Sequence, residues 1–496
     1  MTYPTFHNLI GGQWVAAATG KTILNLNPAD NSDVVGAFPS SHAEDVALGV
    51  AAAKNAFATW RLVPAPKRAE ILVRAGILLQ QRKEKFAREM TREMGKVLAE
   101  TRGDVQEAID EAFYVAGEGR RLFGQTTPSE LQNKFAMSIR MPLGVVGLIT
   151  PWNFPMAIPS WKLFPALVSG NTCVIKPATD TPLSTYNLVQ TLIDAGLPPG
   201  VVNIVAGSGS AVGTPLIEHP DVRAISFTGS SAVGSLVGQR GAATFKPVSL
   251  EMGGKNAQIV MDDANLDLAL DGALWGAFGT TGQRCTATSR ILLQKGIAAE
   301  FTAKLVERAS KLKVGNGLDE SVEVGPQANP NQIETSAKYV EIAIGEGAKL
   351  LTGGHALTHG IYAHGTYFEP TVLGSVTPSM RIAREEVFGP VVSLIEFETF
   401  DEAIEIANSI DYGLSAAIYT KDVNRAFAAI RDLEAGITYI NAPTIGAEVH
   451  LPFGGVKHTG NGHREGNGAI DFFTTWKAVY VDYSDKLQRA QIDNTE

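Results

Sequence analysis

The sequence contains very little cysteine: Cys173 and Cys285 are the only two among 496 residues, too few for a disulfide framework. It also has no basic N-terminal stretch followed by an apolar run, so we expect no signal peptide. No window of about eighteen apolar residues is free of charge, which argues against a membrane span. These absences favour a cytoplasmic protein in which each thiol needs its own explanation.

Basic residues are also scarce relative to acidic ones. The chain has 42 Lys and Arg against 51 Asp and Glu, a formal net charge of −9. This balance argues against a nucleic-acid partner and against binding to an anionic membrane surface. Hydrophobic residues make up 45% of the chain and charged residues 19%, which is typical of a large folded protein with more than one domain.

From Gly144 to about Leu250, short β-rich runs alternate with helical segments, which indicates a parallel sheet covered by helices. The expected strands are Val145–Ile149, Thr172–Ile175, Val201–Val205, Val222–Phe227 and Pro247–Leu250. Such sheets bind ligands beyond the carboxyl ends of their strands. Residues 150–155, 176–179 and 229–234 are therefore expected to form one functional face.

A second alternating region, from about Gln258 to Ile440, predicts another α/β unit. Its expected strands are Gln258–Met261, Arg290–Leu293, Ser415–Thr420 and Ile437–Ile440. Before the first unit we expect an irregular start, then a helix opened by a capping box of Ser41 with Glu44, and a longer helix from about Lys67 to Lys96. Two extended pieces, Lys134–Met141 and Trp476–Tyr483, fall outside both units and are candidates for sheet pairing between subunits.

The two cysteines have different surroundings. Cys173 begins an apolar strand and is most simply a small buried hydrophobic residue. Cys285 lies in the polar segment Gly282–Thr288, where loop exposure and the adjacent Arg284 favour the thiolate. From this segment alone, a reactive cysteine and an ordinary surface thiol are equally good interpretations.

Two polar side chains directly follow expected strands. Glu251 precedes Gly253 and Gly254, so its carboxylate can reach into a cleft while the backbone turns; the alternative is a salt-bridged Glu at a domain junction. Asn153 stands between rigid prolines and aromatic residues in Pro151–Pro155. It is therefore a candidate fixed donor to an oxyanion, or else part of a tight turn.

A glycine-containing segment, Phe227–Gly234, runs from a strand into a helix and can bring phosphate to backbone N–H groups. It is not a G-x-G-x-x-G fingerprint, and neither a G-x-S-x-G elbow nor an H-E-x-x-H, C-x-x-C or Walker motif is present. His355, His359 and His364 have no acidic neighbour, so we expect no metal site.

Together these segments resemble the aldehyde dehydrogenase superfamily. The matching motifs are Pro151-Trp152-Asn153, Phe227-Thr228-Gly229-Ser230, Glu251-Met252-Gly253-Gly254-Lys255, Gly282-Gln283-Arg284-Cys285 and Glu386-Val387-Phe388-Gly389-Pro390, in the family's order and spacing. The resemblance implies an α/β fold with two doubly wound parallel-sheet domains. A cofactor-binding domain would comprise residues 1–133 and 142–254, a catalytic domain residues 255–455, and an oligomerisation β-element residues 134–141 and 470–487.

The resemblance also implies a reaction, the NAD(P)-dependent oxidation of an aldehyde to a carboxylic acid. Cys285 would be the nucleophile that forms a thiohemiacetal and then a thioester. The Asn153 amide and the Cys285 backbone N–H would hold the oxyanion. Glu251 would be the general base that activates water to release the acid.

The cofactor residues that the resemblance implies run from the adenosine end to the nicotinamide end: Lys176, Thr179, Ile149 and Trp152, then Gly229 and Ser230, then Glu386 and Phe388. NAD-preferring relatives often carry Glu three positions after the lysine, whereas this chain has Thr179. Without that carboxylate there is no like-charge repulsion of a 2′-phosphate. Both NAD and NADP are therefore expected to bind, with NADP slightly favoured.

The segment Asn441–Gly455 lies where the family has its substrate-access loop. It is similar to the loop of dehydrogenases that oxidise the semialdehyde 2,5-dioxopentanoate (α-ketoglutaric semialdehyde), as is the tail from Trp476 to Tyr483. An acidic substrate needs a cationic anchor, for which Arg284 and Lys162 are candidates, although a bracing role is favoured for both. His450 is a candidate polar contact or a loop-packing residue.

Other interpretations stay open. The enzyme is alternatively a broad-specificity or aromatic aldehyde dehydrogenase, or a CoA-dependent acylating one, against which Glu251 counts. A catalytically silent homologue is disfavoured because Cys285, Glu251 and Asn153 occur together. The expected partners are a small-molecule aldehyde and, through the extended pieces, further copies of this chain in a homodimer or homotetramer, with no nucleic acid and no membrane.

Overall fold

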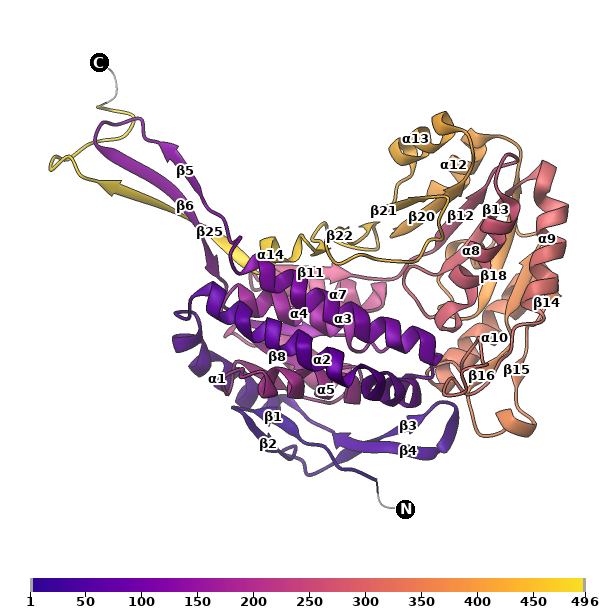
Figure 1. Cartoon of the computed structure of the whole chain (residues 1–496), viewed down its shortest axis with the longest axis horizontal. Helices are drawn as coiled ribbons and strands as arrows, with labels where there is room; N and C mark the ends of the chain where they lie inside the picture. The colour runs from indigo at the N-terminus through magenta and orange to yellow at the C-terminus, as the bar shows by residue number, and fades with distance from the viewer. Residues whose placement is uncertain (1–2, 494–496) are drawn as a thin grey trace.

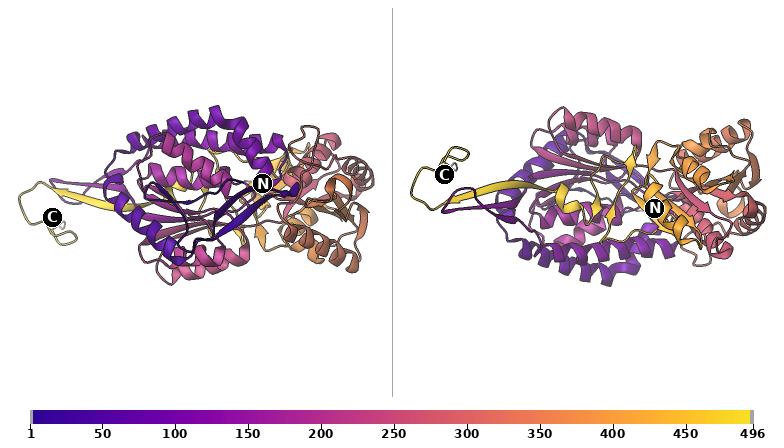
Figure 2. Two further views of the ribbon diagram at one scale, coloured as in Figure 1. Left: turned by 90° about the horizontal axis from the view of Figure 1, so that it is seen from below. Right: turned by 90° about the horizontal axis from the view of Figure 1, so that it is seen from above.

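The computed structural model describes residues 3–493, which form two α/β bodies and a β-arm. Figure 1 shows the first body in indigo to magenta and the second in pink to orange, with the arm extending away from both. The two further views in Figure 2 show the arm at one end of the molecule and the second body at the other. Within residues 3–493, no helix has the length and apolar character needed to span a bilayer.

The first body contains a seven-stranded sheet in the order β11-β10-β7-β8-β9-β1-β2. Its strands are β1 (Asn8–Ile10), β2 (Gln13–Val15), β7 (Val145–Ile149), β8 (Thr172–Lys176), β9 (Val202–Ile204), β10 (Val222–Thr228) and β11 (Val248–Glu251). The five strands from β11 to β9 are parallel and lie within one residue of the expected bounds, so the predicted sheet is confirmed.

Helices cover both faces of this sheet. They are α1 (Ala43–Trp60), α2 (Ala65–Met94), α3 (Leu98–Glu118), α4 (Ala157–Val168), α5 (Pro182–Asp194), α6 (Thr214–Glu218) and α7 (Ser231–Ala242), with a π-helical turn η1 (Gly209–Gly213) before α6. On β7, Val146 and Leu148 face the core under α2 to α5, whereas Val145 and Ile149 face the core under α1, α6 and α7. Burial on both faces explains why the strand is apolar without alternation.

The strand order places a topological switch between β7 and β10. The chain continues from β7 to β8 and β9 in one direction and then returns to add β10 and β11 on the other side. Parallel sheets bind ligands outside the carboxyl ends of the strands at such a point. Trp152 and Asn153 follow β7, and Gly229 and Ser230 follow β10, so both pairs flank the switch.

The second body has its own seven-stranded sheet in the order β14-β17-β18-β13-β12-β20-β21. Its strands are β12 (Asn256–Val260), β13 (Thr288–Gln294), β14 (Lys349–Thr352), β17 (Thr371–Gly374), β18 (Val391–Phe397), β20 (Ser415–Tyr419) and β21 (Ile437–Ile440). Its helices are α8 (Leu266–Phe278), α9 (Lys295–Ala309), α10 (Pro330–Gly345), α11 (Arg381–Arg384), α12 (Phe400–Asn408) and α13 (Val423–Asp432). All neighbouring strands are parallel except β14, which is antiparallel at the edge.

The two expected extended pieces pair with each other in the arm. The arm consists of β5 (Gln125–Pro128), β6 (Lys134–Pro142) and β25 (Thr474–Asp482), with β6 in the middle. β6 and β25 are antiparallel over nine residue pairs, from Thr474 opposite Pro142 to Asp482 opposite Lys134. Within the described residues, β25 is one of the two outer strands of this sheet, and its second edge has no strand beside it.

Smaller elements connect these units. They are β3 (Thr22–Asn27) with β4 (Asp30–Pro39), β15 (Ala356–Leu357) with β16 (Tyr367–Phe368), β19 (Tyr412–Gly413) with β23 (Val456–Lys457), β22 (Pro452–Phe453) with β24 (Glu465–Gly466), the 3-10 turns η2 (Gly279–Gly282) and η3 (Gly360–Tyr362), and α14 (Ala469–Phe472). The division of the chain into domains at residues 133, 254 and 455 stays a prediction.

Two N-terminal expectations were wrong. The start is not irregular, because β1 and β2 form a hairpin around Gly11-Gly12, and β1 extends the first sheet beside β9. The capping box of α1 lies one residue later than predicted. His42 is the N-cap, and its backbone N–H donates to the Asp45 carboxylate, whereas Ser41 is buried and accepts from Asn8.

Candidate active site

Two cavities between the bodies meet at Cys285. One has a volume of about 610 Å³ and is lined by aromatic residues of α4 and its preceding loop, and by Phe453; the other, of about 650 Å³, reaches the loops after β7 and β10. Cys285, Thr228, Met252 and Ile158 line both. A thiol at this junction can contact one molecule on each side, so the two cavities are candidate sites for two reactants.

The loop that carries Cys285 has an unusual backbone. Thr280 and Thr281 in η2 have φ values of 52° and 57°, in the left-handed region that β-branched residues rarely adopt. Glu100 on α3 holds this turn, because its two carboxylate oxygens accept from the Thr280 N–H at 2.8 and 2.7 Å. The Thr280 hydroxyl also donates to Glu100 at 3.0 Å. Contacts of this kind maintain a backbone conformation that is unfavourable in isolation.

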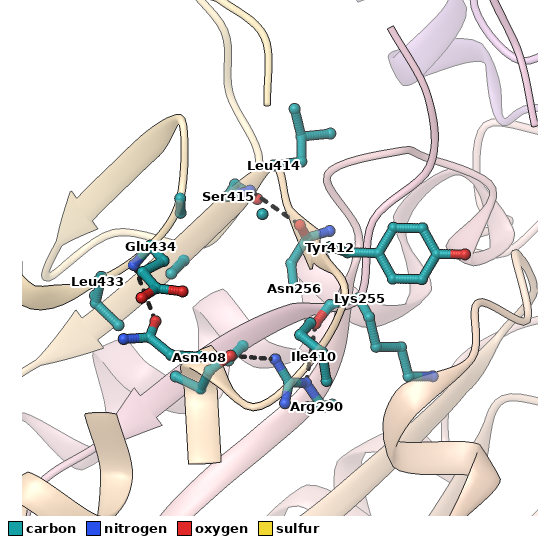
Figure 3. A pocket seen from close by; sticks show the side chains of 15 residues that line it. Lys255, Asn256, Arg290, Asn408, Ile410, Tyr412, Leu414, Ser415, Leu433 and Glu434 are labelled. Carbon is teal, nitrogen blue, oxygen red and sulfur yellow. Dashed lines mark hydrogen bonds between the residues drawn. The ribbon is translucent and has the colours of Figure 1, made fainter. Parts of the chain in front are cut away.

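A second brace lies behind Cys285. The Asn256 amide donates to the carbonyl oxygens of Cys285 at 2.8 Å and Ala287 at 2.9 Å, and its oxygen accepts from the Ser415 N–H at 3.0 Å. Figure 3 shows the Asn256–Ser415 bond beside a separate cavity of about 260 Å³, which Arg290 also lines. Asn256 is a positioning residue that the sequence analysis did not identify.

The Cys285 thiol is less acidic than the sequence predicts. Burial raises its pKa to about 12, and the nearby Glu386 and Glu251 carboxylates add to the increase. The Thr286 backbone N–H and Arg284 act in the opposite direction but are outweighed. Arg284 does favour the thiolate, as expected, but desolvation exceeds the effect of this one partly neutralised cation, so the net change in the Cys285 pKa is an increase. Cys173, by contrast, is fully buried in β8 as expected.

Glu251 ends β11 and faces the same cavity as Cys285, with only 2% of its surface exposed. Burial raises the pKa of its carboxyl well above the ordinary value, and the neighbouring Glu465 raises it further. Lys162 and Arg464 oppose this shift. Gly454 passes so close that a Cβ there would lie 2.4 Å from the Glu251 oxygen, so this turn requires glycine. A base with a raised pKa is suited to taking a proton near neutral pH.

Lys162 is part of an internal ion pair. Its amine, fully buried on α4, contacts the Glu465 carboxylate and donates to the Ser226 hydroxyl at 2.8 Å. A lysine committed to these partners is not free to hold a substrate, which agrees with the bracing role favoured from the sequence. Glu465, which lines the cavity beside Glu251, was missed because it lies more than two hundred residues from Glu251 in a segment without a motif.

Asn153 lies at the carboxyl end of β7 and lines the cavity that reaches the loops after β7 and β10. Its side-chain nitrogen donates to the Gln283 carbonyl at 3.1 Å, two residues before Cys285. This bond uses one of the two amide hydrogens, and the other makes no hydrogen bond to a described residue. The arrangement connects the nucleophile loop of the second body to a fixed amide donor of the first.

The second cavity has the lining expected for a dinucleotide. Gly229 and Ser230 lie at the N-terminus of α7, where backbone N–H groups can receive a pyrophosphate. At the other end the Glu386 carboxylate accepts from the Gly254 N–H at 2.9 Å. A Cβ on Gly253 would lie 2.0 Å from the Glu386 carboxylate, so this close approach requires glycine. Burial raises the pKa of Glu386 to about 7.

The remaining cofactor candidates lie on the same side of the protein. Phe388 packs edge-on against Trp152 at 5.3 Å, and both line the second cavity. Lys176, at the end of β8, is buried and donates to the Pro177 carbonyl at 2.6 Å. Ile149, one strand away, is buried at the end of β7 and pairs with Lys176 in the sheet. The residues present therefore fit an extended ligand with an adenosine end and a nicotinamide end.

Thr179 is exposed and adjoins a loop rich in hydroxyl groups. Its hydroxyl donates to the Gly207 carbonyl at 3.4 Å, and the Lys176 amine reaches the same carbonyl at 3.3 Å. Ser208 and Ser210 follow Gly207 directly, with their hydroxyls 3.3 Å apart. Burial lowers the pKa of Lys176 to about 8.

The first cavity has apolar walls and one cationic residue. Phe154, Trp161 and Phe453 provide aromatic surface, and Phe453 packs edge-on against Trp161 at 5.3 Å. Arg284 lines this cavity and is also braced, because its Nη2 contacts Glu100 at 3.2 Å. His450 does not line it; it is exposed and lies 3.3 Å from Glu448.

Comparison with known proteins identifies relatives along nearly the whole chain. The model of the aldehyde dehydrogenase family matches residues 14–479. The alpha-ketoglutaric semialdehyde dehydrogenase of Bacillus subtilis (strain 168) is 45% identical over 478 residues, covering 96% of this chain and 98% of that protein. The alpha-ketoglutarate semialdehyde dehydrogenase of Haloferax volcanii is 43% identical over 485 residues, covering 97% and 100%. The crystal structure of an E. coli NADP-dependent enzyme superposes with a TM-score of 0.93 at 38% identity, covering 96% and 98%.

Proposed function

The chain belongs to the aldehyde dehydrogenase family and is an NAD(P)-dependent aldehyde dehydrogenase, and we propose that its substrate is α-ketoglutaric semialdehyde (2,5-dioxopentanoate). Two relatives with this activity in their names are more than 40% identical over almost their full length. The cationic Arg284 beside Cys285 suits an aldehyde that carries a carboxylate at its other end.

The observation that carries the proposal is the position of Cys285 between two cavities. One cavity has the aromatic and cationic lining of a small organic acid site, and the other has the glycines, helix N-terminus and carboxylate of a dinucleotide site. A nicotinamide cofactor held there would supply the acceptor for the hydride that leaves when a thiohemiacetal on Cys285 becomes a thioester. We assign its ribose to Glu386, the pyrophosphate to Gly229 and Ser230, and the adenosine side to Lys176.

Cys285 is proposed to attack the aldehyde carbon from the junction of the cavities. Because burial holds the thiol protonated, a base must take its proton during attack, and the Glu251 carboxylate lines the same cavity. The carbonyl oxygen then carries negative charge. The free amide hydrogen of Asn153 and the Cys285 backbone N–H are the donors assigned to it, and each such donor contributes about 3 to 4 kcal/mol to transition states of this kind.

Glu251 is proposed to act again in release of the acid, once it has passed the thiol proton on to solvent and is again a carboxylate. It takes a proton from water, the hydroxide attacks the thioester carbon, and the bond to Cys285 sulfur breaks to give a carboxylic acid and free thiolate. The proton must then leave a buried carboxyl. The Lys162–Glu465 pair lies next to Glu251, and the proton can pass to solvent through the Lys162 ammonium and the Glu465 carboxylate.

We infer that both NADP and NAD are used, with NADP favoured. Thr179 places no carboxylate at the adenosine ribose, and the Ser208 and Ser210 hydroxyls beside it are suitable donors to a 2′-phosphate. The Lys176 amine adds a nearby cationic group. These contacts favour the phosphorylated cofactor without excluding the other.

We further propose that the enzyme assembles as a homodimer or homotetramer through the arm. The outer edge of β25 has backbone groups without a partner strand among the described residues, and pairing with a second chain would satisfy them. Its two cysteines are both unpaired, which supports a location in the reducing cytoplasm.

The test is a substrate and cofactor matrix. Purified enzyme is assayed by reduced-cofactor absorbance with α-ketoglutaric semialdehyde, succinic semialdehyde and benzaldehyde, each with NAD and NADP. Selective turnover of the first supports the proposal, whereas equal turnover of all three or a preference for benzaldehyde removes the substrate assignment. The Cys285→Ala variant should show no oxidation with any pair, and retained turnover would refute the nucleophile. Acyl transfer to CoA in place of acid release would instead favour the acylating alternative.

A further inference from the structure

We propose that Arg284 is the substrate-specificity residue of this enzyme and binds the carboxylate at the far end of the aldehyde. This inference rests on the proposed function, because it assumes that the substrate is an aldehyde with a carboxylate. It does not depend on which aldehyde of that kind is the substrate. Arg284 directly precedes the nucleophile and, among the described residues that line the aldehyde-side cavity, is the one cation. Its role beyond bracing follows from how its guanidinium is held.

The guanidinium is fixed on one side and open on the other. Its Nε donates to the Thr280 hydroxyl at 2.9 Å, and its Nη2 donates to Glu100 at 3.2 Å. The Nη1 group makes no hydrogen bond to a described residue, so its N–H groups are available to donate to a carboxylate oxygen. An arginine held in this way loses little conformational freedom when it binds a ligand.

The flanking aromatic rings indicate where the open side lies. The guanidinium carbon is 5.2 Å from the centre of the Phe154 ring, which lines the cavity, and 5.9 Å from the half-exposed ring of Trp275. The charge therefore lies between the inner wall and the solvent. An aldehyde carbon at Cys285 with a chain extending outward would bring its distal carboxylate toward this group.

The acidic residues of the cavity do not cancel this charge completely. Glu107, Glu251 and Glu465 also line it, but Glu465 is paired with Lys162, and burial raises the pKa of Glu251 well above its ordinary value. Burial raises the pKa of Glu107 to about 8, so this carboxyl is largely neutral at pH 7 and can donate a hydrogen bond. Glu100 neutralises Arg284 only in part, because it also accepts from the Thr280 N–H through both oxygens.

Other cations near the site are already engaged. Lys162 is buried against Glu465, Lys96 is buried against Asp104 at 2.6 Å, and Arg464 donates to the Gly455 carbonyl at 2.6 Å. None of the three lines the aldehyde-side cavity. An anionic aldehyde that enters this cavity therefore has Arg284 as its cationic partner.

The experiment compares acid-bearing and uncharged aldehydes in Arg284 variants. The kcat/KM values of wild type, Arg284→Met and Arg284→Lys are measured with α-ketoglutaric semialdehyde, succinic semialdehyde and pentanal. We expect Arg284→Met to lower the ratio of acid to pentanal kcat/KM by about 10- to 100-fold, the usual effect of losing a charged hydrogen bond. The ratio for Arg284→Lys should lie between those of the wild type and Arg284→Met. Inhibition by 2-oxoglutarate should be strongest in the wild type, weaker in Arg284→Lys and weakest in Arg284→Met. Pentanal turnover reports that each variant is folded.

The Glu100→Gln variant separates binding from bracing. This variant disturbs the loop that carries Cys285 but leaves the Arg284 cation in place. The kcat/KM values for acid-bearing aldehydes and for pentanal should therefore fall together, and their ratio should stay at or above its wild-type value. If Arg284→Met lowers acid and pentanal turnover in equal proportion, or if Glu100→Gln lowers the ratio as Arg284→Met does, Arg284 is only a brace and the proposal is wrong. If the wild type oxidises succinic semialdehyde but not α-ketoglutaric semialdehyde, only the proposed substrate is contradicted. In that case, a lower ratio of succinic semialdehyde to pentanal kcat/KM in Arg284→Met would still support carboxylate binding by Arg284.

Discussion

The Glu100 carboxylate lies 2.8 and 2.7 Å, through its two oxygens, from the backbone nitrogen of Thr280, 180 residues further along the chain. This contact joins α3 of the first body to the strained turn that precedes Cys285 in the second. The turn places the thiol at the junction of two cavities, so a carboxylate that takes no part in the chemistry governs where the nucleophile lies.

Removing the Glu100 side chain should reduce catalysis while leaving substrate binding nearly intact. We expect Glu100→Ala to lower kcat at least about 10-fold with little change in KM, because the Thr280 N–H loses its acceptor and the turn relaxes. Glu100→Gln, which retains one acceptor oxygen but loses the second acceptor and the charge, should also lower kcat, though by less than Glu100→Ala. A lost buried hydrogen bond also costs about 1 to 3 kcal/mol of stability, to be checked by chemical denaturation. Equal kcat in all three proteins would contradict the positioning role.

Alkylation should reveal the high pKa of Cys285. A group with a pKa of about 12 is almost entirely thiol at pH 7, so its reaction with iodoacetamide in the cofactor-free enzyme should rise about tenfold for each pH unit between 7 and 10. The measurement uses Cys173→Ser, so that Cys285 alone can react. A rate that is already at its plateau at pH 7 would show that the thiolate is stabilised in the free enzyme.

The pH dependence of acid release should depend on Glu465. Glu251 works as an anion, so activity is lost as the pH falls through its pKa, and Glu465 raises that pKa. Glu465→Gln removes the repelling charge and should move the acid limb of the kcat profile to lower pH. Glu434→Gln, which changes an exposed carboxylate paired with Lys457, is the matched control and should leave the limb in place. A shift of the limb to higher pH in Glu465→Gln would contradict this electrostatic account.

Cofactor preference should respond to charge at position 179. Thr179→Glu introduces a carboxylate near the site assigned to the 2′-phosphate, and charge repulsion should lower kcat/KM for NADP by at least about 10-fold while that for NAD changes little. Thr179→Gln has similar size without the charge and should retain NADP activity. If both variants lose NADP activity equally, the effect is steric and the proposed role of charge fails.

Much of the fold follows from local sequence patterns. The parallel strands were recognisable because runs such as Val145–Ile149 are continuously apolar and bounded by turns. Asn153 was expected on one functional face because parallel strands present their carboxyl ends on the same edge, and Glu251 was expected to reach into a cleft from the end of a strand. The structure brings both to the cavities at Cys285.

The remaining features depend on contacts between distant segments. Glu100, Asn256 and Glu465 stand in ordinary helix or strand sequence, and each has its partner at least 29 residues away along the chain. The Cys285 pKa could not be inferred from its neighbours in sequence, because burial and the approach of Glu386 outweigh the adjacent arginine. The strands β1 and β2 were missed because each has only three residues and all three residues of β2 are exposed.

Intact and peptide mass analysis of the Glu251→Gln variant, after a single addition of aldehyde and NADP, tests the roles of Cys285 and Glu251 together. Because Glu251 also takes the thiol proton, we expect this variant to form reduced cofactor slowly and to stop at one equivalent, with an acyl group retained as a thioester on the peptide that contains Cys285. Reduction of cofactor without an acylated Cys285, or unimpaired steady-state turnover in this variant, would contradict the proposed roles of Cys285 as nucleophile and Glu251 as base.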